Sequence, residues 1–301
     1  VYGDTNSTLA GSLAAAKLHI PVGHVEGGMR SFNRRMPEEI NRVLTDHVAK
    51  WHFCATETAV KNLKNEGITE GVHLVGDVMH DAVLLYRDVA REKSDVLHRL
   101  CLIEPEQGPG LKAQGDVDGP YALRPMPYAL CTVHRAENTD DPSRLKNILD
   151  ALVEISKDMP VVLPLHPRTR KAIDDAGFKS LITHHSLLIT DPVSYLDMLQ
   201  LEQNASIILT DSGGMQKEAF WLGVPCVTMR DETEWVETVE AGMNKVVGAD
   251  KGAITRAAKE FSLSSVAGQQ TRSIKAVAAA SVSILNHLAS CFRHQHLGSS
   301  N

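Results

Sequence analysis

Short apolar runs alternate with longer amphipathic stretches along most of the chain, and this alternation restricts the possible folds more than any other feature. Strands separated by helices of this size form parallel sheets covered by helices. Uninterrupted runs such as Ile207-Ile208-Leu209 are typical of parallel strands buried on both faces. We therefore expect an α/β fold. The expected strands are 21–24, 51–55, 72–76, 128–133, 161–164, 186–189, 206–210 and 225–229, and the expected helices are 7–18, 38–48, 57–66, 142–157, 195–200, 214–222 and 251–261.

A segment rich in proline, glycine and acidic residues interrupts the alternation at 103–127. Such a composition is typical of a linker or surface insertion. It predicts a partial N-terminal α/β domain at 1–102 and a C-terminal α/β domain at 128–280, followed by a C-terminal helix and tail at 281–301. Because the first residues read as the end of a strand, we expect that earlier strands of the N-terminal domain are missing from this sequence.

The overall composition narrows the function classes. A net charge of −6 gives no basis for a nucleic-acid or anionic-membrane partner, and no apolar run approaches the roughly 20 residues that span a bilayer. The 5 cysteines are scattered without metal-binding spacing, which is typical of reduced thiols in a cytoplasmic protein. Because no GxGxxG opens a strand–helix unit and the histidines are dispersed, we expect neither a redox cofactor nor a metal.

One strand–turn–helix segment carries the clearest chemical signal. The expected strand 206–210 passes through Asp211-Ser212-Gly213-Gly214 directly into a helix. Paired glycines let a ligand approach the backbone, and the N–H groups of a helix start attract an anion. Glu218 follows about one turn later, where its carboxylate can accept hydrogen bonds from a sugar diol. These features predict a site for a nucleotide-sugar diphosphate, and the alternative is an ordinary βα turn.

Other polar side chains also follow expected strands. Imidazole and guanidinium groups after 128–133 and 161–164 suit a diphosphate, and they are His134, Arg135, His166, Arg168 and Arg170. The N-terminal part offers carboxylates instead, and a carboxylate can take a proton from carbon if the site desolvates it. These are Asp4, Glu26 and Glu38. Three alternatives stay open: Asp4 could cap the following helix, Glu38 and Glu39 could complement a helix dipole, and His134 could be structural.

Five motifs in this order resemble the non-hydrolysing UDP-N-acetylglucosamine 2-epimerases. They are 2–8, 23–31, 36–42, 133–138 and 210–214. The likeness covers nearly the whole chain outside 103–127 and the tail. It implies two Rossmann-like domains of the glycosyltransferase-B type, with the active site in an interdomain cleft. It also implies a cytoplasmic homodimer that acts on a UDP-sugar in polysaccharide biosynthesis.

The family's reaction is an anti elimination of UDP across C1–C2, giving a 2-acetamidoglucal, followed by reprotonation of C2 on the opposite face and return of UDP. The resemblance implies proton-transfer roles for three carboxylates, without deciding which is the C2 base. It also implies a histidine near the diphosphate and C1, a phosphate-binding turn, a ribose-binding glutamate and backbone contacts to uracil. By position, the three carboxylates are Asp4, Glu26 and Glu38, and the histidine is His134, with Arg135 and His166 beside it. The phosphate-binding turn is Ser212, Gly213 and Gly214, and the ribose-binding glutamate is Glu218. The uracil-binding stretch is 191–198, with Met198 at its end.

The chain departs from the family pattern in three places. The N-terminal glycine turn with its arginine and lysine would precede Val1, Gly27 stands where alanine is usual, and Trp235-Val236 stand where arginine and proline are commoner. The versions at 31–35 and 234–237 resemble epimerases that act on UDP-2,3-diacetamido-2,3-dideoxyglucuronic acid, which is the alternative substrate. Two further alternatives are a UDP-sugar glycosyltransferase of the same architecture and a truncated, inactive chain that binds UDP.

Overall fold

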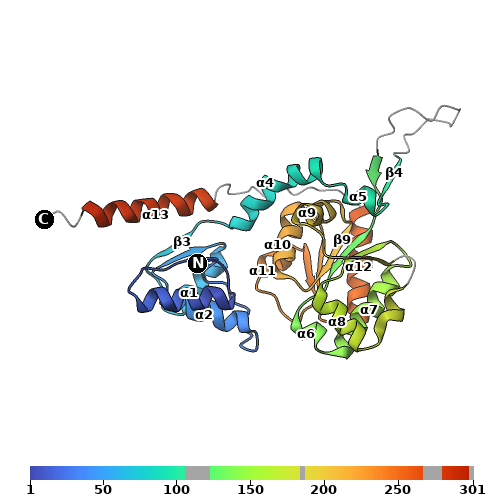
Figure 1. Ribbon diagram of the computed structural model, residues 1–301, viewed down its shortest axis with the longest axis horizontal. Helices are drawn as coiled ribbons and strands as arrows, with labels where there is room; N and C mark the ends of the chain where they lie inside the picture. The colour runs from blue at the N-terminus through green and yellow to red at the C-terminus, as the bar shows by residue number, and fades with distance from the viewer. Residues whose placement is uncertain (106–122, 184–186, 267–279, 298–301) are drawn as a thin grey trace. The chain divides into compact units, whose positions relative to one another are not determined.

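The computed structural model describes residues 1–105, 123–183, 187–266 and 280–297 (Figure 1). Contacts divide the chain into two units: unit 1 comprises Val1–Leu84 and Ile274–Asn301, and unit 2 comprises Leu85–Ser273. The boundaries expected at 102 and 280 stay a prediction. Residues 106–122 of the expected linker and the tail 298–301 lie outside the described residues. At the two ends of the expected linker, β4 (Ile103–Pro105) and β5 (Leu123–Pro125) pair as antiparallel strands.

Unit 2 is built on a six-stranded parallel sheet in the order β11-β10-β9-β6-β7-β8. The expectation of a parallel α/β fold is therefore confirmed. All the strands expected in this part of the chain are present, although β11 was not expected. Their bounds are β6 (Ala129–Thr132), β7 (Val161–Pro164), β8 (Leu187–Thr190), β9 (Ile207–Thr210), β10 (Cys226–Thr228) and β11 (Asn244–Val246).

Side chains of these strands alternate between two buried cores, as the pleat requires. In β9, Ile207 and Leu209 belong to one core and Ile208 to the other. Helices cover both faces of the sheet (Figure 1). One face packs against α7 (Pro142–Ile155), α8 (Pro167–Asp175) and α12 (Lys251–Val266), and the other against α5 (Val96–Arg99), α9 (Tyr195–Asn204) and α10 (Gly213–Leu222). Short helices α6 (Ala136–Thr139), η1 (Phe178–Ile182) and α11 (Val236–Glu240) complete the unit.

Unit 1 contains a three-stranded parallel sheet, and a parallel bridge joins Tyr2 to Val25 beside it. Ile284 packs against Phe53 and Val75 on the sheet, so the C-terminal helix belongs to this core. No helix in the described ranges has both the length and the apolar character needed to cross a membrane. The elements are β1 (Gly23–Val25), β2 (Trp51–Cys54), β3 (Val72–Leu74), α1 (Asn6–Lys17), α2 (Pro37–Val48), α3 (Glu57–Asn65) and α13 (Ala280–Leu297), and the division between the units falls inside α4 (Val78–Lys93).

Candidate active site

The strand order of unit 2 reverses between β6 and β9. After β6 the chain adds β7 and β8 on one side, and it then returns to place β9, β10 and β11 on the other. The loops that follow β6 and β9 therefore leave the carboxyl edge of the sheet side by side, which is where ligands bind in open α/β sheets. His134 and Arg135 follow β6, whereas Ser212, Gly213 and Gly214 follow β9. The fold brings these predicted residues to one edge.

A buried carboxylate joins the two loops. Asp211 is fully buried and accepts hydrogen bonds from the backbone N–H groups of His134 and Arg135, both at 3.0 Å. The side-chain amide of Asn138 also donates to it, at 3.1 Å. Hydrogen bonds to an ionised acceptor are about twice as strong as neutral ones. Asp211 was not a sequence candidate, although its place directly after a buried strand was a usable signal.

The glycine turn begins α10 and leaves backbone donors at its edge. Ser212 is the N-cap, and its hydroxyl oxygen accepts from the Met215 N–H at 3.4 Å. The N–H groups of Gly213 and Gly214 belong to the first turn, where no carbonyl of the helix can accept them. A Cβ on Gly213 would lie 2.7 Å from Glu234 Oε1, so a side chain here would displace that carboxylate. These donors and the helix dipole form a site that favours an anion.

His134 presents an imidazole beside this turn. Its ring centroid lies 5.6 Å from that of His166, and its Nδ1 lies 3.6 Å from Asp211 Oδ1. Burial lowers the pKa of His134 below its ordinary value. The Asp211 carboxylate raises that pKa in part, and nearby cationic groups lower it further. Nδ1 of His166 accepts the Arg168 N–H at 3.2 Å. His134 is thus held as a neutral imidazole at neutral pH.

The expected group of three arginines is not assembled. Arg168 donates to both oxygens of Asp140, at 2.8 and 2.9 Å, and Arg170 donates to Asp191 at 2.7 Å. Both arginines are exposed. They lie two positions apart on α8 and so project from different sides of that helix. Arg135, the N-cap of α6, is the arginine that stays with His134.

The expected nucleoside-binding residues lie on two neighbouring helices. Glu218 is a buried residue of α10, and its carboxylate lies within hydrogen-bonding reach of the Tyr195 hydroxyl. Met198 lies in α9, where its N–H donates to the Ser194 carbonyl at 2.8 Å and its side chain packs against the core. That N–H is therefore engaged within the helix. Uracil contacts through the backbone near Met198 stay a prediction.

In unit 1, two of the predicted carboxylates leave neighbouring strand ends. The Tyr2–Val25 bridge places Asp4 and Glu26 just beyond the two paired segments. Glu26 Oε2 lies 3.5 Å from the position that a Cβ on Gly3 would take, so its carboxylate lies against the Gly3 turn. The backbone of Glu26 has φ +73°, a left-handed conformation that is costly for a residue with a side chain and is enriched at functional sites.

Asp4 is held by an arginine and does not cap the following helix. Its Oδ2 accepts a hydrogen bond from Arg42 Nη2 at 2.6 Å, and its carbonyl accepts one from the Asn41 side chain at 2.9 Å. Thr5 is the N-cap of α1, since its hydroxyl accepts the Thr8 N–H at 3.2 Å. The capping alternative for Asp4 is therefore wrong.

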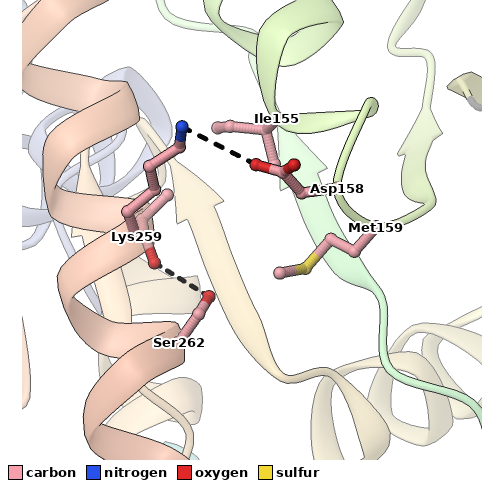
Figure 2. Close-up of a pocket in the computed structure, with 6 residues that line it drawn as sticks. Ile155, Asp158, Met159, Lys259 and Ser262 are labelled. Carbon is pink, nitrogen blue, oxygen red and sulfur yellow. Dashed lines mark hydrogen bonds and ion pairs between the residues drawn. The ribbon is translucent and has the colours of Figure 1, made fainter.

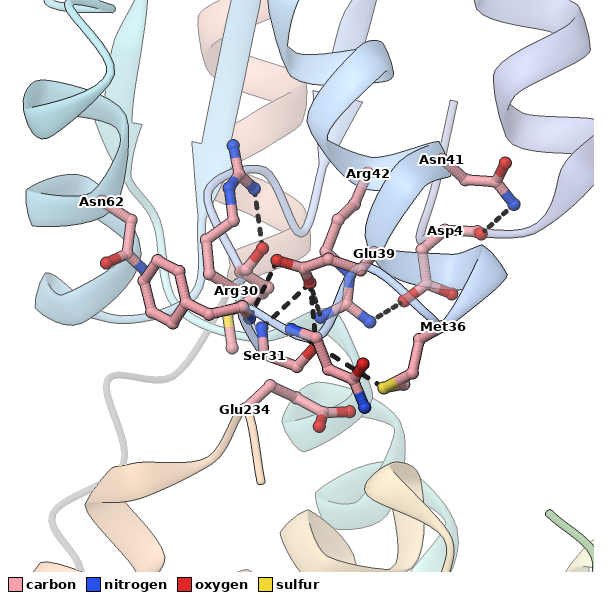
Figure 3. Close-up of polar contacts among 12 residues, drawn as sticks. Asp4, Arg30, Ser31, Met36, Glu39, Asn41, Arg42, Asn62 and Glu234 are labelled. Atoms are coloured by element: carbon pink, nitrogen blue, oxygen red, sulfur yellow. Dashed lines mark hydrogen bonds and ion pairs between the residues drawn. The ribbon is translucent and has the colours of Figure 1, made fainter. Parts of the chain in front are cut away.

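The two adjacent glutamates of α2 differ in their contacts. Glu39 is buried and accepts from the N–H and the hydroxyl of Ser31, at 2.9 and 3.0 Å, and from the N–H of Phe32 at 3.0 Å (Figure 3). It therefore fixes the 31–35 loop, in addition to lying at a helix N-terminus. Glu38 is half-buried, one position earlier on the helix that carries Arg42 to Asp4.

A buried network lies beneath the Gly3 turn. His24 places Nδ1 at 2.6 Å from Asp46 Oδ1 and Nε2 at 2.9 Å from the Gly3 carbonyl oxygen. Asp46 also accepts from the Gly28 N–H at 3.0 Å and from Arg30 at 2.7 Å. Burial by itself would raise the pKa of Asp46, but His24 and Arg30 outweigh it and hold that pKa below its ordinary value. Sequence reasoning did not single out His24 or Asp46 as individual site residues.

Two units thus carry complementary chemistry: carboxylates at strand ends in one, and an anion-binding turn with a neutral imidazole in the other. In a comparison with known proteins, the UDP-N-acetylglucosamine 2-epimerase family matches residues 1–281. The chain belongs to the UDP-N-acetylglucosamine 2-epimerase family. Its fold is of the glycosyltransferase-B type, as in the solved structures of the family.

Individual members of the epimerase family are closely similar. The UDP-2,3-diacetamido-2,3-dideoxy-D-glucuronate 2-epimerase of Pseudomonas aeruginosa is 51% identical over 263 residues, which cover 86% of this chain and 66% of that protein. The crystal structure of the Methanocaldococcus jannaschii UDP-GlcNAc 2-epimerase with UDP-GlcNAc and UDP has a TM-score of 0.76 at 43% identity, covering 87% of this chain and 68% of that one. The Neisseria meningitidis UDP-GlcNAc 2-epimerase bound to UDP-GlcNAc has a TM-score of 0.78 at 31% identity, covering 96% and 75%. The chain thus spans about two thirds of the length of the curated epimerases that it matches.

Two departures from the epimerase pattern lie beside site elements. Trp235 is buried, and its Nε1 lies 3.4 Å from the position that a Cβ on Gly213 would take. Lys217 Nζ lies 4.2 Å from the centroid of the Trp235 ring. A Cβ on Gly27 would lie 3.1 Å from Asp46 Oδ1, so the alanine that is usual in the family would require a small shift there. The tryptophan thus packs against the anion-binding turn.

A separate pocket of about 300 Å³ lies in unit 2 between α7 and α12 (Figure 2). Asp158 and Met159, which line it, lie in the short segment before β7. The pocket therefore lies at the amino edge of the parallel sheet, whereas His134 and Gly213 follow the carboxyl ends of their strands. It is separate from the candidate active site.

Proposed function

We propose that the chain catalyses the reversible 2-epimerisation of UDP-N-acetylglucosamine to UDP-N-acetylmannosamine. A carboxylate removes the proton from C2 while the C1–O bond breaks, and UDP leaves with the bonding electron pair. The resulting 2-acetamidoglucal receives a proton at C2 on the opposite face, and UDP adds back to C1. Atoms and electrons balance without an oxidant or reductant.

The observation that carries the proposal is the anion-binding edge of unit 2. Asp211 ties the loop after β6 to the loop after β9, and this puts backbone donors and a neutral imidazole next to one another. We propose that Ser212, Gly213 and Gly214 bind the diphosphate. His134 faces the diphosphate and C1, where a neutral imidazole can donate a hydrogen bond to the leaving oxygen.

Other unit 2 residues complete the proposed nucleotide contacts. Glu218 accepts hydrogen bonds from the ribose diol, which suits a buried carboxylate that already contacts a tyrosine hydroxyl. Arg135 and His166 add donors near the diphosphate, and backbone groups near Met198 bind uracil. The assignments of Glu218 and Met198 follow the resemblance by position, and those of Arg135 and His166 follow from the chemistry of their side chains.

The proton-transfer roles fall to the carboxylates of unit 1. Asp4 is held by Arg42, and Glu26 lies against the Gly3 turn with a strained backbone. Glu38 lies in the first turn of the helix that carries Arg42. We propose that these three groups share the removal and return of the C2 proton. Arg42 holds the Asp4 carboxylate in a fixed orientation, which a base requires.

The test is incubation of the chain with UDP-N-acetylglucosamine in heavy water. We expect deuterium at C2 and formation of UDP-N-acetylmannosamine. Changing Asp4→Asn, Glu26→Gln or Glu38→Gln should each lower the exchange rate about 100-fold or more. Glu57→Gln, an exposed acid at the start of α3, is the matched control. Absence of both deuterium and epimer would reject this substrate. Tight UDP binding without exchange would indicate a chain that only binds UDP. Sugar transfer to an acceptor without exchange would indicate a glycosyltransferase.

A second candidate substrate is UDP-2,3-diacetamido-2,3-dideoxyglucuronic acid. The 51% identity with the Pseudomonas aeruginosa epimerase named for that compound favours it. The substrate with the higher kcat/KM of the two, measured by epimer formation under identical conditions, decides between them.

We also propose that the protein is a cytoplasmic homodimer that supplies a sugar nucleotide for polysaccharide biosynthesis. Buried thiols such as Cys131 and Cys226 fit a reducing compartment. Sedimentation equilibrium measures the assembly, and fractionation of cells measures the location. A monomer at the cellular concentration, or recovery outside the cytoplasm, would contradict these two statements.

A further inference from the structure

A second acid lies behind the proposed ribose-binding glutamate. Glu202, on α9, is 1% exposed. Among the described residues, neither of its carboxyl oxygens accepts a hydrogen bond from an N–H group or a hydroxyl group. Its carboxyl group does lie within hydrogen-bonding reach of the Glu218 carboxyl group on α10. Two buried acids from neighbouring helices are therefore in contact.

Two ionised carboxylates cannot form such a contact. Neither has a proton to donate, and their repulsion is strong where water is excluded. A pair of acids that share a site therefore holds one proton between them, and the pair rather than either residue titrates. One of the two carboxyl groups must be neutral for the observed contact to persist.

Among the described residues, the titratable side chains that interact with Glu202 supply no positive charge in place of this proton. They are Glu218 on α10, Tyr195 on its own helix, Tyr128 ahead of β6, and Cys226 on β10. All are acids, and the Tyr128 hydroxyl already donates to the Leu201 carbonyl at 2.6 Å.

We propose that Glu202 carries this proton at neutral pH and donates it to Glu218, making Glu202 a positioning residue for the ribose-binding carboxylate. Glu218 then accepts one hydrogen bond from Glu202 and one from the Tyr195 hydroxyl. These two contacts fix the orientation of the Glu218 carboxylate at the proposed ribose site. The proposal rests on the assignment of Glu218 to the ribose.

The surroundings of Glu202 favour its neutral form. Burial raises the pKa of Glu202 well above its ordinary value, and the charge and hydrogen bond of Glu218 raise it further. Burial likewise raises the pKa of Cys226 to about 12, with a contribution from Glu202. Because the folded-state pKa of Glu202 lies above that of the unfolded chain, its favourable contribution is complete at acidic pH and is lost as the pH rises through the folded-state pKa.

The test compares Glu202→Gln and Glu202→Leu in the full chain. Glutamine keeps an N–H donor for Glu218 but cannot ionise, whereas leucine keeps the bulk without a donor. UDP and 2′,3′-dideoxy-UDP are titrated calorimetrically over a range of pH. We expect the wild type to lose UDP affinity as the pH rises, and Glu202→Gln to keep that affinity without this pH dependence. Glu202→Leu should lose roughly tenfold in UDP affinity, about the value of one hydrogen bond to a charged group, with no loss for the dideoxy analogue.

Infrared spectroscopy supplies an independent measurement. The wild type at neutral pH should show the carbonyl band of a buried protonated carboxylic acid, and Glu202→Gln should lack it. Absence of that band in the wild type, or equal losses for UDP and its dideoxy analogue in Glu202→Leu, would overturn the proposal. If Glu202→Leu does not fold, the infrared band and the pH profile of Glu202→Gln decide alone.

These measurements do not depend on turnover. A chain that shows the infrared band and the diol-dependent affinity but no deuterium exchange at C2 would retain the Glu202–Glu218 arrangement and lose the epimerase assignment. A chain that exchanges deuterium at C2 but lacks the infrared band would retain the epimerase assignment and lose the Glu202–Glu218 arrangement.

Discussion

At the scale of single residues, buried carboxylates organise both parts of the candidate site. Asp211 accepts hydrogen bonds from N–H groups of a loop that lies far from it in sequence. Asp46 is hydrogen-bonded to His24, Gly28 and Arg30. Each carboxylate satisfies donors that would otherwise be buried without a partner, which is costly. Their contribution is therefore to hold loops in place for the groups that would touch substrate.

Asp211→Asn tests this at the anion-binding edge. An amide has one acceptor oxygen where the carboxylate has two, and its NH2 group would face other donors. We expect a loss of about 2–4 kcal/mol in the free energy of unfolding, and UDP binding at least about tenfold weaker. Urea unfolding and calorimetry measure the two effects. Asp140→Asn, which removes an exposed partner of Arg168, should leave both nearly unchanged.

Acid unfolding tests Asp46. Its folded-state pKa is lowered, so its stabilising contribution is complete above the unfolded-state pKa and is lost as the pH falls through the folded-state pKa. The urea midpoint of the wild type should therefore fall as the pH drops below about 4. Asp46→Asn should start from a lower midpoint and show a flatter acid dependence. Parallel curves for the two proteins would contradict the assignment.

At the scale of elements, close backbone approaches fix the turns that carry the carboxylates. Gly28 has φ +82°, and a Cβ there would lie 2.4 Å from the Ala59 carbonyl oxygen at the start of α3. Asn62, on the same helix, donates to the Gly28 carbonyl at 3.0 Å. The loop after β1 is thus fastened to α3, and this directs the chain from Glu26 towards α2.

A comparison of Gly28→Ala with Gly67→Ala separates the energetic cost of this close approach from the cost of the left-handed backbone conformation. Gly67 has nearly the same dihedral, φ +83°, but open space where a Cβ would lie. Gly67→Ala should cost about 1 kcal/mol in unfolding free energy, the price of the left-handed conformation alone. Gly28→Ala should cost roughly 3 kcal/mol or more, because the carbonyl of Ala59 must also move. Equal costs in urea unfolding would show that packing against α3 contributes nothing.

At the scale of the whole molecule, the two units divide the proposed chemistry between them. All proposed nucleotide contacts belong to unit 2, and the three proposed proton-transfer carboxylates belong to unit 1. Binding of UDP and removal of the C2 proton should therefore be separable by mutation.

Asp4→Asn and Asp211→Asn form the pair that tests this separation. We expect Asp4→Asn to keep UDP affinity within about threefold while C2 exchange is lost, since one lost charge-assisted bond in unit 1 does not touch the nucleotide contacts. Asp211→Asn should weaken both. Hydrogen exchange with UDP present should protect the amides of Gly213 and Gly214. Equal loss of UDP affinity in both variants would contradict the division.

The sequence by itself determined the α/β class, the buried strands and the glycine turn, because residue periodicity, paired glycines and helix starts are local signals. It also predicted that the carboxylates Asp4 and Glu26 follow strands. It did not reveal α8 or β11, since short or strongly polar segments give a weak periodic signal. It also missed α4, although that helix is long and amphipathic.

Tertiary structure alone decided which groups meet. The strand order placed Asp211 beside the loop after β6. The geometry of α8 directed Arg168 and Arg170 to surface aspartates. Asp4 binds Arg42 and does not cap a helix. The contact of Glu202 with Glu218 likewise depends on how α9 packs beside α10. Such contacts join residues far apart in the chain, and local sequence patterns carry no information about them until the sheet is assembled.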